Sequence, residues 1–113
     1  MAHDEGVAEI LRADLSETSG ITETPMFGGL CFLHQGNMLC GVHGASYGFA
    51  AMYRVGKSNM ADALAIPGTA PMGFSGRPMG GIVDAEADLV ADDARRAALL
   101  GLALGFVTAL PPK

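Results

Sequence analysis

The chain has 113 residues, of which 50% are hydrophobic and 17% are charged, a length that suits one domain over residues 1–113 with a single core. Twelve acidic against seven basic residues give a net charge of −5, the wrong sign for direct binding to nucleic-acid phosphates. No apolar run reaches the roughly 18 residues of a membrane helix, and the first residues lack a signal-peptide pattern, so we expect a cytoplasmic protein.

The first segment has the apolar spacing of a helix. Val7, Ile10 and Leu11 recur at helical intervals, which predicts a helix from Asp4 to about Glu17 with one apolar stripe. The segment TSGITETPMFGG follows and is rich in turn residues. Because Pro25 cannot continue a helix, we expect a turn here that leads into a strand only at Met26-Phe27.

Three short strands are predicted next, at about Leu30 to His34, Met38 to His43 and Tyr47 to Val55, separated by QGN and GAS. They form an antiparallel meander. In a hairpin centred on Gln35-Gly36, each strand residue has a defined partner across the ladder.

The register of this hairpin decides how its two cysteines lie. A turn at Gln35-Gly36 makes Cys31 and Cys40 a directly opposed pair, close enough for a strained cross-strand disulfide. A turn one residue later would place Cys40 opposite Leu33 instead. In a reducing cytoplasm we expect both cysteines to be free, buried thiols.

Cys31, His34, Cys40 and His43 are four zinc-type ligands within thirteen positions. Alternate residues of a strand point to opposite faces, so an offset of three turns each cysteine away from the histidine that follows it. The two histidines also lie roughly 20 Å apart along the hairpin. We therefore expect no metal site, with solvated histidines and packed thiols.

Gly56-Lys57-Ser58 matches the end of a phosphate-binding loop. The full motif needs a glycine five residues before Gly56, where this chain has Ala51. We therefore expect Gly56 to end a strand and Ser58 to cap a short helix. Its apolar face and its stop are Met60, Ala63, Leu64 and Pro67-Gly68.

The segment PMGFSGRPMGGIV predicts a hairpin that turns at Ser75-Gly76. This register places Phe74 opposite Arg77, Met72 opposite Met79, and Gly73 opposite Pro78. Because Pro78 has no N–H to donate to an outer strand, it predicts a sheet edge at that point.

An acidic run precedes the last helix and is interpreted as a solvated loop with a helix cap rather than a cation site. Its members are Asp84, Glu86, Asp88, Asp92 and Asp93.

The segment DDARRAALLGLALGFVTALPPK predicts a C-terminal helix of about four turns or more that ends at Pro111-Pro112. Its apolar residues cover more than one stripe, so this helix is either wedged in the core or shared with a second subunit. These residues are Leu99, Leu100, Leu102, Leu104, Phe106, Val107 and Leu110.

The predicted order is helix, three strands, helix, two strands, helix, which is an α+β fold with one mainly antiparallel sheet packed by helices. The seven methionines are interpreted chiefly as core filling. No serine lies in G-x-S-x-G, and nothing like G-x-G-x-x-G opens a helix. We therefore expect no catalytic, cofactor-binding or metal-binding residue and no cofactor.

Taken in order, the segments PMFGGLCFLHQGNMLCGV, YRVG, PMGFSGRPMGGIV and ALPPK resemble the N-terminal domain of the TfoX/Sxy family, bacterial proteins named for regulators of natural competence. The resemblance runs from about Thr24 to Lys113. It implies an α+β fold of the type seen in secretion chaperones and brings no catalytic residues. The longer competence regulators carry a second, helical domain, so this chain looks like a stand-alone version.

Two classes of function follow. The favoured hypothesis is a non-enzymatic regulatory or protein-binding module that acts through a partner protein or through self-association as a homodimer, using the apolar C-terminal helix. The alternative is a small ligand-binding protein or thiol-dependent enzyme with a pocket between helix and sheet. In that case Cys31 or Cys40 and a histidine form the reactive pair.

Overall fold

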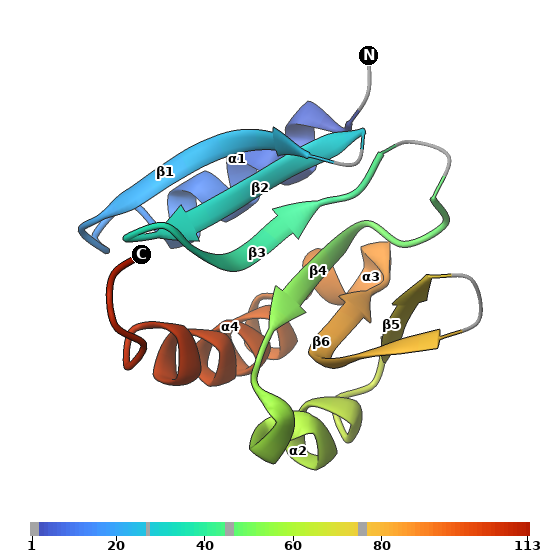
Figure 1. The fold of residues 1–113 in the computed structure, drawn as a ribbon. Helices are drawn as coiled ribbons and strands as arrows, with labels where there is room; N and C mark the ends of the chain where they lie inside the picture. Colours follow the sequence, from blue (N-terminus) through green and yellow to red (C-terminus); the bar gives the residue numbers. More distant parts are fainter. Residues whose placement is uncertain (1–2, 27, 45–46, 75–76) are drawn as a thin grey trace.

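The computed structural model describes residues 3–26, 28–44, 47–74 and 77–113 (Figure 1). No helix of these ranges is long and apolar enough to cross a membrane. In chain order the elements are α1 (Glu5–Asp14), β1 (Ile21–Met26), β2 (Gly29–His34), β3 (Asn37–Val42), β4 (Ala51–Arg54), the 3-10 helix η1 (Lys57–Asn59), α2 (Met60–Leu64), β5 (Thr69–Phe74), β6 (Arg77–Ala85), α3 (Ala87–Val90) and α4 (Asp93–Val107).

The strands form one antiparallel sheet of six strands in the order β1-β2-β3-β4-β6-β5. This confirms the predicted α+β class. Strand β1 was missed, because residues 21–26 were expected to be a turn. It is an edge strand with mostly exposed or half-buried side chains, so it lacks a strong apolar alternation, and Pro25 is tolerated because an edge strand has one unpaired side.

The helix starts follow the sequence only in part. The side chain of Asp4 accepts hydrogen bonds from the N–H groups of Gly6 and Val7, so α1 begins as predicted but ends at Asp14, before Glu17. The chain turns at Gly56, whose φ is +87°, as predicted. Ser58, however, lies inside η1 and makes no capping hydrogen bond, so its predicted role as an N-cap was wrong.

The β2–β3 hairpin turns at Gln35-Gly36, as predicted, with positive φ at both residues as a type I′ turn requires. The predicted cysteine register was wrong. A β-bulge leaves Leu39 without an opposite residue, so Phe32 faces Cys40 and Cys31 faces Gly41. The bulge lets Leu39 and Cys40 both enter the helix-side core, while Cys31 lies in a separate cluster. Both cysteines are free and buried.

The β5–β6 hairpin pairs Phe74 with Arg77 and Gly73 with Pro78, as predicted. The predicted turn, Ser75-Gly76, lies outside the described residues. The register shifts between Pro71 and Gly73, and no Cα pair joins Met72 to Met79. β4 pairs with β6 only from Ile82 to Ala85. Within the described ranges, Pro78 therefore lies on a part of β6 with no strand on its other side, which confirms the predicted edge.

All four α-helices contribute to a core on one face of the sheet. Figure 1 shows α1 behind β1 and β2, and α3 behind β4 and β6. From α4 this core takes Leu99, Leu100, Ala103 and Val107, while Leu102, Leu104 and Phe106 pack half-buried against it. The C-terminal helix was expected either to be wedged in the core or to be shared with a second subunit. Its most buried positions lie in the core of the protein itself. Asp92 caps α4 through the N–H of Arg95.

The segment after α4 returns to the β2–β3 hairpin. The backbone N–H of Lys113 donates to the carbonyl of Gln35 over 2.9 Å. The buried side chain of Asn37 donates from Nδ2 to the carbonyl of Pro111, also over 2.9 Å. These two bonds hold residues 111–113 against the hairpin.

Candidate functional site

The second face of the sheet carries a small cluster made only of strand residues. Its buried members are Cys31, Met52, Met72 and Ile82, and Met26, Leu33 and Met38 pack against them. Of the methionine side chains that the structure describes, Met26, Met38, Met52 and Met72 belong to this cluster. They fill a core, as expected, but on the face opposite the helices.

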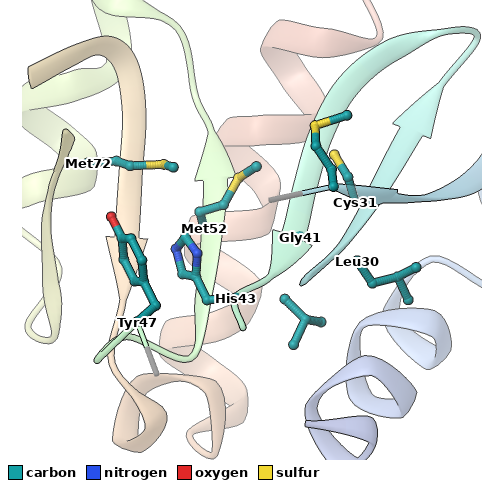
Figure 2. Close-up of a pocket in the computed structure, with 9 residues that line it drawn as sticks. Leu30, Cys31, Gly41, His43, Tyr47, Met52 and Met72 are labelled. Atoms are coloured by element: carbon teal, nitrogen blue, oxygen red, sulfur yellow. The ribbon is translucent and has the colours of Figure 1, made fainter. Parts of the chain in front are cut away.

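A pocket of about 50 Å³ opens in this face (Figure 2). In Figure 2, Tyr47 and His43 lie near Met72 and Met52, with Cys31 and Leu30 farther along the pocket. The lining residues come from strands and from the segment after β3. They are Met26, Leu30, Cys31, Gly41, Val42, His43, Tyr47, Met52 and Met72.

One row of register partners forms the floor of the pocket. Cys31 pairs with Gly41, Gly41 with Met52, and Met52 with Asp84. Cross-strand partners project from the same face of a sheet. Because Gly41 has no side chain, it leaves a gap in this row between Cys31 and Met52. A Cβ atom at Gly41 would lie 2.8 Å from the carbonyl oxygen of Leu30. The glycine therefore both creates the hollow and permits the close approach of β2.

The sheet must be strongly curved at the pocket. Met26 lies on β1 and Met72 on β5, which are the two edge strands of the sheet. In a flat sheet these strands would lie roughly 24 Å apart, at about 4.8 Å per neighbouring pair. Both side chains nevertheless line one small pocket. Curvature thus buries an apolar cluster whose described members all come from strands.

A histidine, a tyrosine and an aspartate interact at one end of the pocket. His43 Nε2 lies 2.6 Å from Asp84 Oδ1, and the Tyr47 hydroxyl donates to Asp84 Oδ2 over 3.0 Å. A carboxylate can only accept, so Nε2 carries the hydrogen. The rings of His43 and Tyr47 stack with centroids 3.8 Å apart and planes 12° apart.

Asp84 is the most buried member of this triplet, with a side chain that is 3% exposed against 10% for His43. The interpretation of Asp84 as part of a solvated acidic loop was therefore wrong. It lies on β6, and burial of a carboxylate is costly unless both of its oxygens are bonded. His43 and Tyr47 meet one oxygen each, which fastens the segment after β3 to the sheet. The pKa of Tyr47 is raised, chiefly by burial and to a smaller extent by the hydrogen bond to Asp84.

The cysteines and histidines of the sequence motif are divided between the two faces. Cys31 and His43 line the pocket, whereas Cys40 lies wholly buried in the helix-side core. His34 pairs with Asn37 beside the turn, at the far end of the hairpin from His43. Within the described ranges, no group of three or more His, Cys, Asp or Glu side chains is arranged to hold a metal ion.

The thiol that lines the pocket is not activated. Burial raises the pKa of Cys31 to about 11. A nucleophilic cysteine needs the opposite shift, produced by a neighbouring cation or a helix N-terminus. The thiol of Cys31 is therefore protonated at neutral pH and contributes to the pocket as a small apolar group.

Sequence reasoning missed the triplet, although one signal was available. In GIVDAE, Ile82 and Asp84 share one face of a strand and Val83 and Ala85 share the other. A strand that continues to Ala85 would have placed Asp84 inside the sheet. His43 lies two residues after Gly41, so strand alternation places it on the same face of the sheet as Gly41. The partnership of residues 41 positions apart has no local signal.

Searches against protein-family models, curated proteins and solved structures find no significant match to this chain.

Proposed function

We propose that the protein is a non-enzymatic protein-binding module whose pocket receives one apolar side chain from a partner protein. The size and lining of the pocket carry this proposal. Sites for small molecules usually enclose about 300–1,000 Å³, whereas this pocket encloses about 50 Å³ between sulfur-containing and aliphatic side chains. A space of this size suits a single leucine or methionine side chain rather than a metabolite.

The lining favours a protein partner for a second reason. Methionine side chains are flexible and polarizable, so they adapt to apolar groups of different shape. Met26, Met52 and Met72 reach the pocket from three strands. His43 adds one polar group at the end of the pocket, held in place by Asp84. Such a site orients an apolar side chain beside one hydrogen-bonding group.

The thiol-dependent enzyme was the competing hypothesis. Cys31 and His43 do share the pocket, which is the arrangement that hypothesis needs. The raised pKa of Cys31 removes the thiolate on which nucleophilic chemistry depends, and this favours a binding role. We further propose kinship with the N-terminal domain of the TfoX/Sxy family and its chaperone-like fold, on the sequence segments quoted above, and hence a regulatory role.

The test is site-specific photo-cross-linking in the native cell. A photoreactive residue at Thr24, the register partner of Cys31, places the probe beside the pocket. We expect one cross-linked partner protein, and we expect Cys31→Met, which lengthens a lining side chain, to abolish that product. Leu64→Ser is the matched control, because Leu64 is an exposed apolar residue of α2 that does not line the pocket.

Three results would contradict the proposal: no specific product, a product that persists in Cys31→Met, or a product lost equally in Leu64→Ser. A cross-link to a second copy of the chain would also contradict it, because the occupant would then be the protein itself. Molar mass measured by light scattering across a dilution series identifies that case. Circular dichroism of each variant confirms that the fold is retained.

A further inference from the structure

A second, larger hollow of about 390 Å³ lies where the end of β4, the start of η1, the middle of β6 and α4 meet. We name it the basic groove. Its lining residues are Arg54, Gly56, Lys57, Ser58, Gly80, Gly81 and Phe106. No carboxylate is among them, although the chain has twelve acidic residues.

The two cations of the groove have no anionic partner within the part of the chain that the structure describes. Arg12, Arg95 and Arg96 each form an ion pair with a nearby carboxylate. Arg54 and Lys57 form none. In a protein of net charge −5, two unpaired cations that line one hollow make the local potential positive.

Packing holds both cations at the groove. The guanidinium of Arg54 lies over the ring of Phe106, with its carbon 5.4 Å from the ring centroid, so the edge of its planar fork stays available for hydrogen bonds. The stem of Lys57 crosses Gly80 so closely that a Cβ atom there would lie 2.8 Å from Lys57 Cε. Glycine at position 80 therefore leaves room for the lysine.

Glycine also brings the two sides of the groove together. Gly81 has φ of +86°, and a Cβ atom on it would lie 3.2 Å from the Cα of Gly56. The carbonyl of Gly81 accepts hydrogen bonds from the N–H groups of Val55 and Gly56. The Gly-Lys-Ser segment thus lines the basic groove by its place in the fold, although it is not part of a phosphate-binding loop.

We propose that the basic groove binds the phosphate group of a small phosphorylated metabolite. Two positive charges match a phosphate dianion, for which an arginine fork and a lysine point charge are suited donors. The hydroxyl of Ser58 adds a further donor at the groove. The volume falls in the range of small-molecule sites, which leaves space for the organic part of a phosphate ester. This site is separate from the pocket around His43, and neither proposal depends on the other.

The test is a titration of the isotope-labelled protein with glucose 6-phosphate, inorganic phosphate and acetate at 150 mM sodium chloride, followed by amide NMR. We expect shifts centred on Lys57, Ser58, Gly80 and Gly81, with glucose 6-phosphate binding at least as tightly as inorganic phosphate and acetate much more weakly. Arg54→Gln and Lys57→Gln should each weaken phosphate binding about tenfold or more, because each removes a charged donor.

Arg12→Gln is the matched control, since it changes the net charge equally but removes a cation that pairs with Glu23 away from the groove. It should leave the affinity unchanged. Lys57 is exposed, so its variant reports on binding even where Arg54→Gln disturbs packing. Shifts scattered over the surface, or an equal loss in all three variants, would overturn the site. If the groove binds inorganic phosphate but not glucose 6-phosphate, the proposal that its ligand is a phosphorylated metabolite would be wrong.

Discussion

His43 donates from Nε2 to Oδ1 of Asp84 over 2.6 Å, and this bond joins the segment after β3 to a strand 41 positions later. Both side chains are largely buried, with 10% and 3% exposed. His43 lines the pocket, so this bond holds one of the lining side chains of the proposed binding site in place.

The first prediction concerns the energy of this pair. His43→Ala and Asp84→Ala should each lower the free energy of unfolding, by about 2 kcal/mol for Asp84→Ala because two donors lose their acceptor. The double variant should cost less than the sum of the two, with a coupling of about 1 kcal/mol or more. Urea unfolding of the four proteins measures these values. Additive effects would show that the pair contributes no specific interaction.

An ion pair elsewhere in the chain provides the comparison. Arg12 Nε lies 2.7 Å from Glu23 Oε2, at similar separation but with about a third of each side chain exposed. Solvent screens such a pair. A double-mutant cycle at Arg12 and Glu23 should therefore give a much smaller coupling energy than the cycle at His43 and Asp84. A larger coupling energy at Arg12 and Glu23 would contradict the claim that burial strengthens the His43–Asp84 pair.

The second prediction concerns Tyr53, which is fully buried and whose hydroxyl has no hydrogen-bond partner among the residues that the structure describes. Burial also raises the pKa of Tyr53, so the hydroxyl keeps its hydrogen. A buried unsatisfied hydroxyl costs about 1–3 kcal/mol. Tyr53→Phe removes only that group and should leave the protein equally or more stable in urea unfolding.

Tyr47→Phe is the matched substitution, because its hydroxyl is bonded to Asp84. It should lower the free energy of unfolding by about 1–2 kcal/mol. The two tyrosines should thus respond to the same chemical change in opposite directions. A destabilised Tyr53→Phe variant would mean that its hydroxyl has a partner, such as an internal water.

The third prediction follows from the raised pKa of Cys31. Its change from 9.0 to about 11 lowers the thiolate fraction at pH 8 about 100-fold, since each pKa unit is tenfold. In a Cys40→Ala background, reaction with a disulfide reagent should be slow at pH 8 and rise about tenfold per pH unit towards pH 11. Fast reaction with a plateau near pH 9 would contradict it and revive the thiol-dependent enzyme.

The raised pKa of Cys31 also makes the stability of the protein depend on pH, and between pH 9 and about 11 the free energy of unfolding falls as the pH rises. The folded protein favours the neutral Cys31 thiol, so this contribution to stability is fully present below pH 9 and is lost as the pH rises towards 11. The decrease in the free energy of unfolding from pH 8 to pH 10.5 should be larger in the Cys40→Ala protein than in the Cys31→Ala/Cys40→Ala double variant.

Much of the fold followed from local chemistry. The start of α1 at Asp4, the cap at Asp92, the Gln35-Gly36 turn and the turn at Gly56 each depend on a few neighbouring residues. Strand β1 was missed because an exposed edge strand has little apolar alternation to reveal it. Local sequence therefore reports on elements that bury a face or need a special backbone angle.

The site depended on relationships that local sequence does not contain. The bulge at Leu39 shifted the expected register by one residue, so that Cys31 and Cys40 lie on opposite faces of the sheet. It allows two consecutive side chains, Leu39 and Cys40, to pack into the helix-side core. Asp84 belongs to an acidic run in the sequence, but in the structure it is a buried residue of strand β6. Its burial depends on His43 and Tyr47, which only the tertiary fold brings near.

The last prediction concerns residues 111–113, which the side chain of Asn37 holds against the β2–β3 hairpin through the carbonyl of Pro111. Asn37→Ala should free this segment, so hydrogen exchange at the Lys113 N–H, bonded to Gln35 in the native protein, should accelerate at least tenfold. The stability cost should be about 1 kcal/mol. Asn59→Ala, which removes a comparable bond of 3.0 Å to the carbonyl of Val55, should leave that exchange unchanged. Equal acceleration in both variants would mean that global unfolding, rather than release of the segment, exposes this amide.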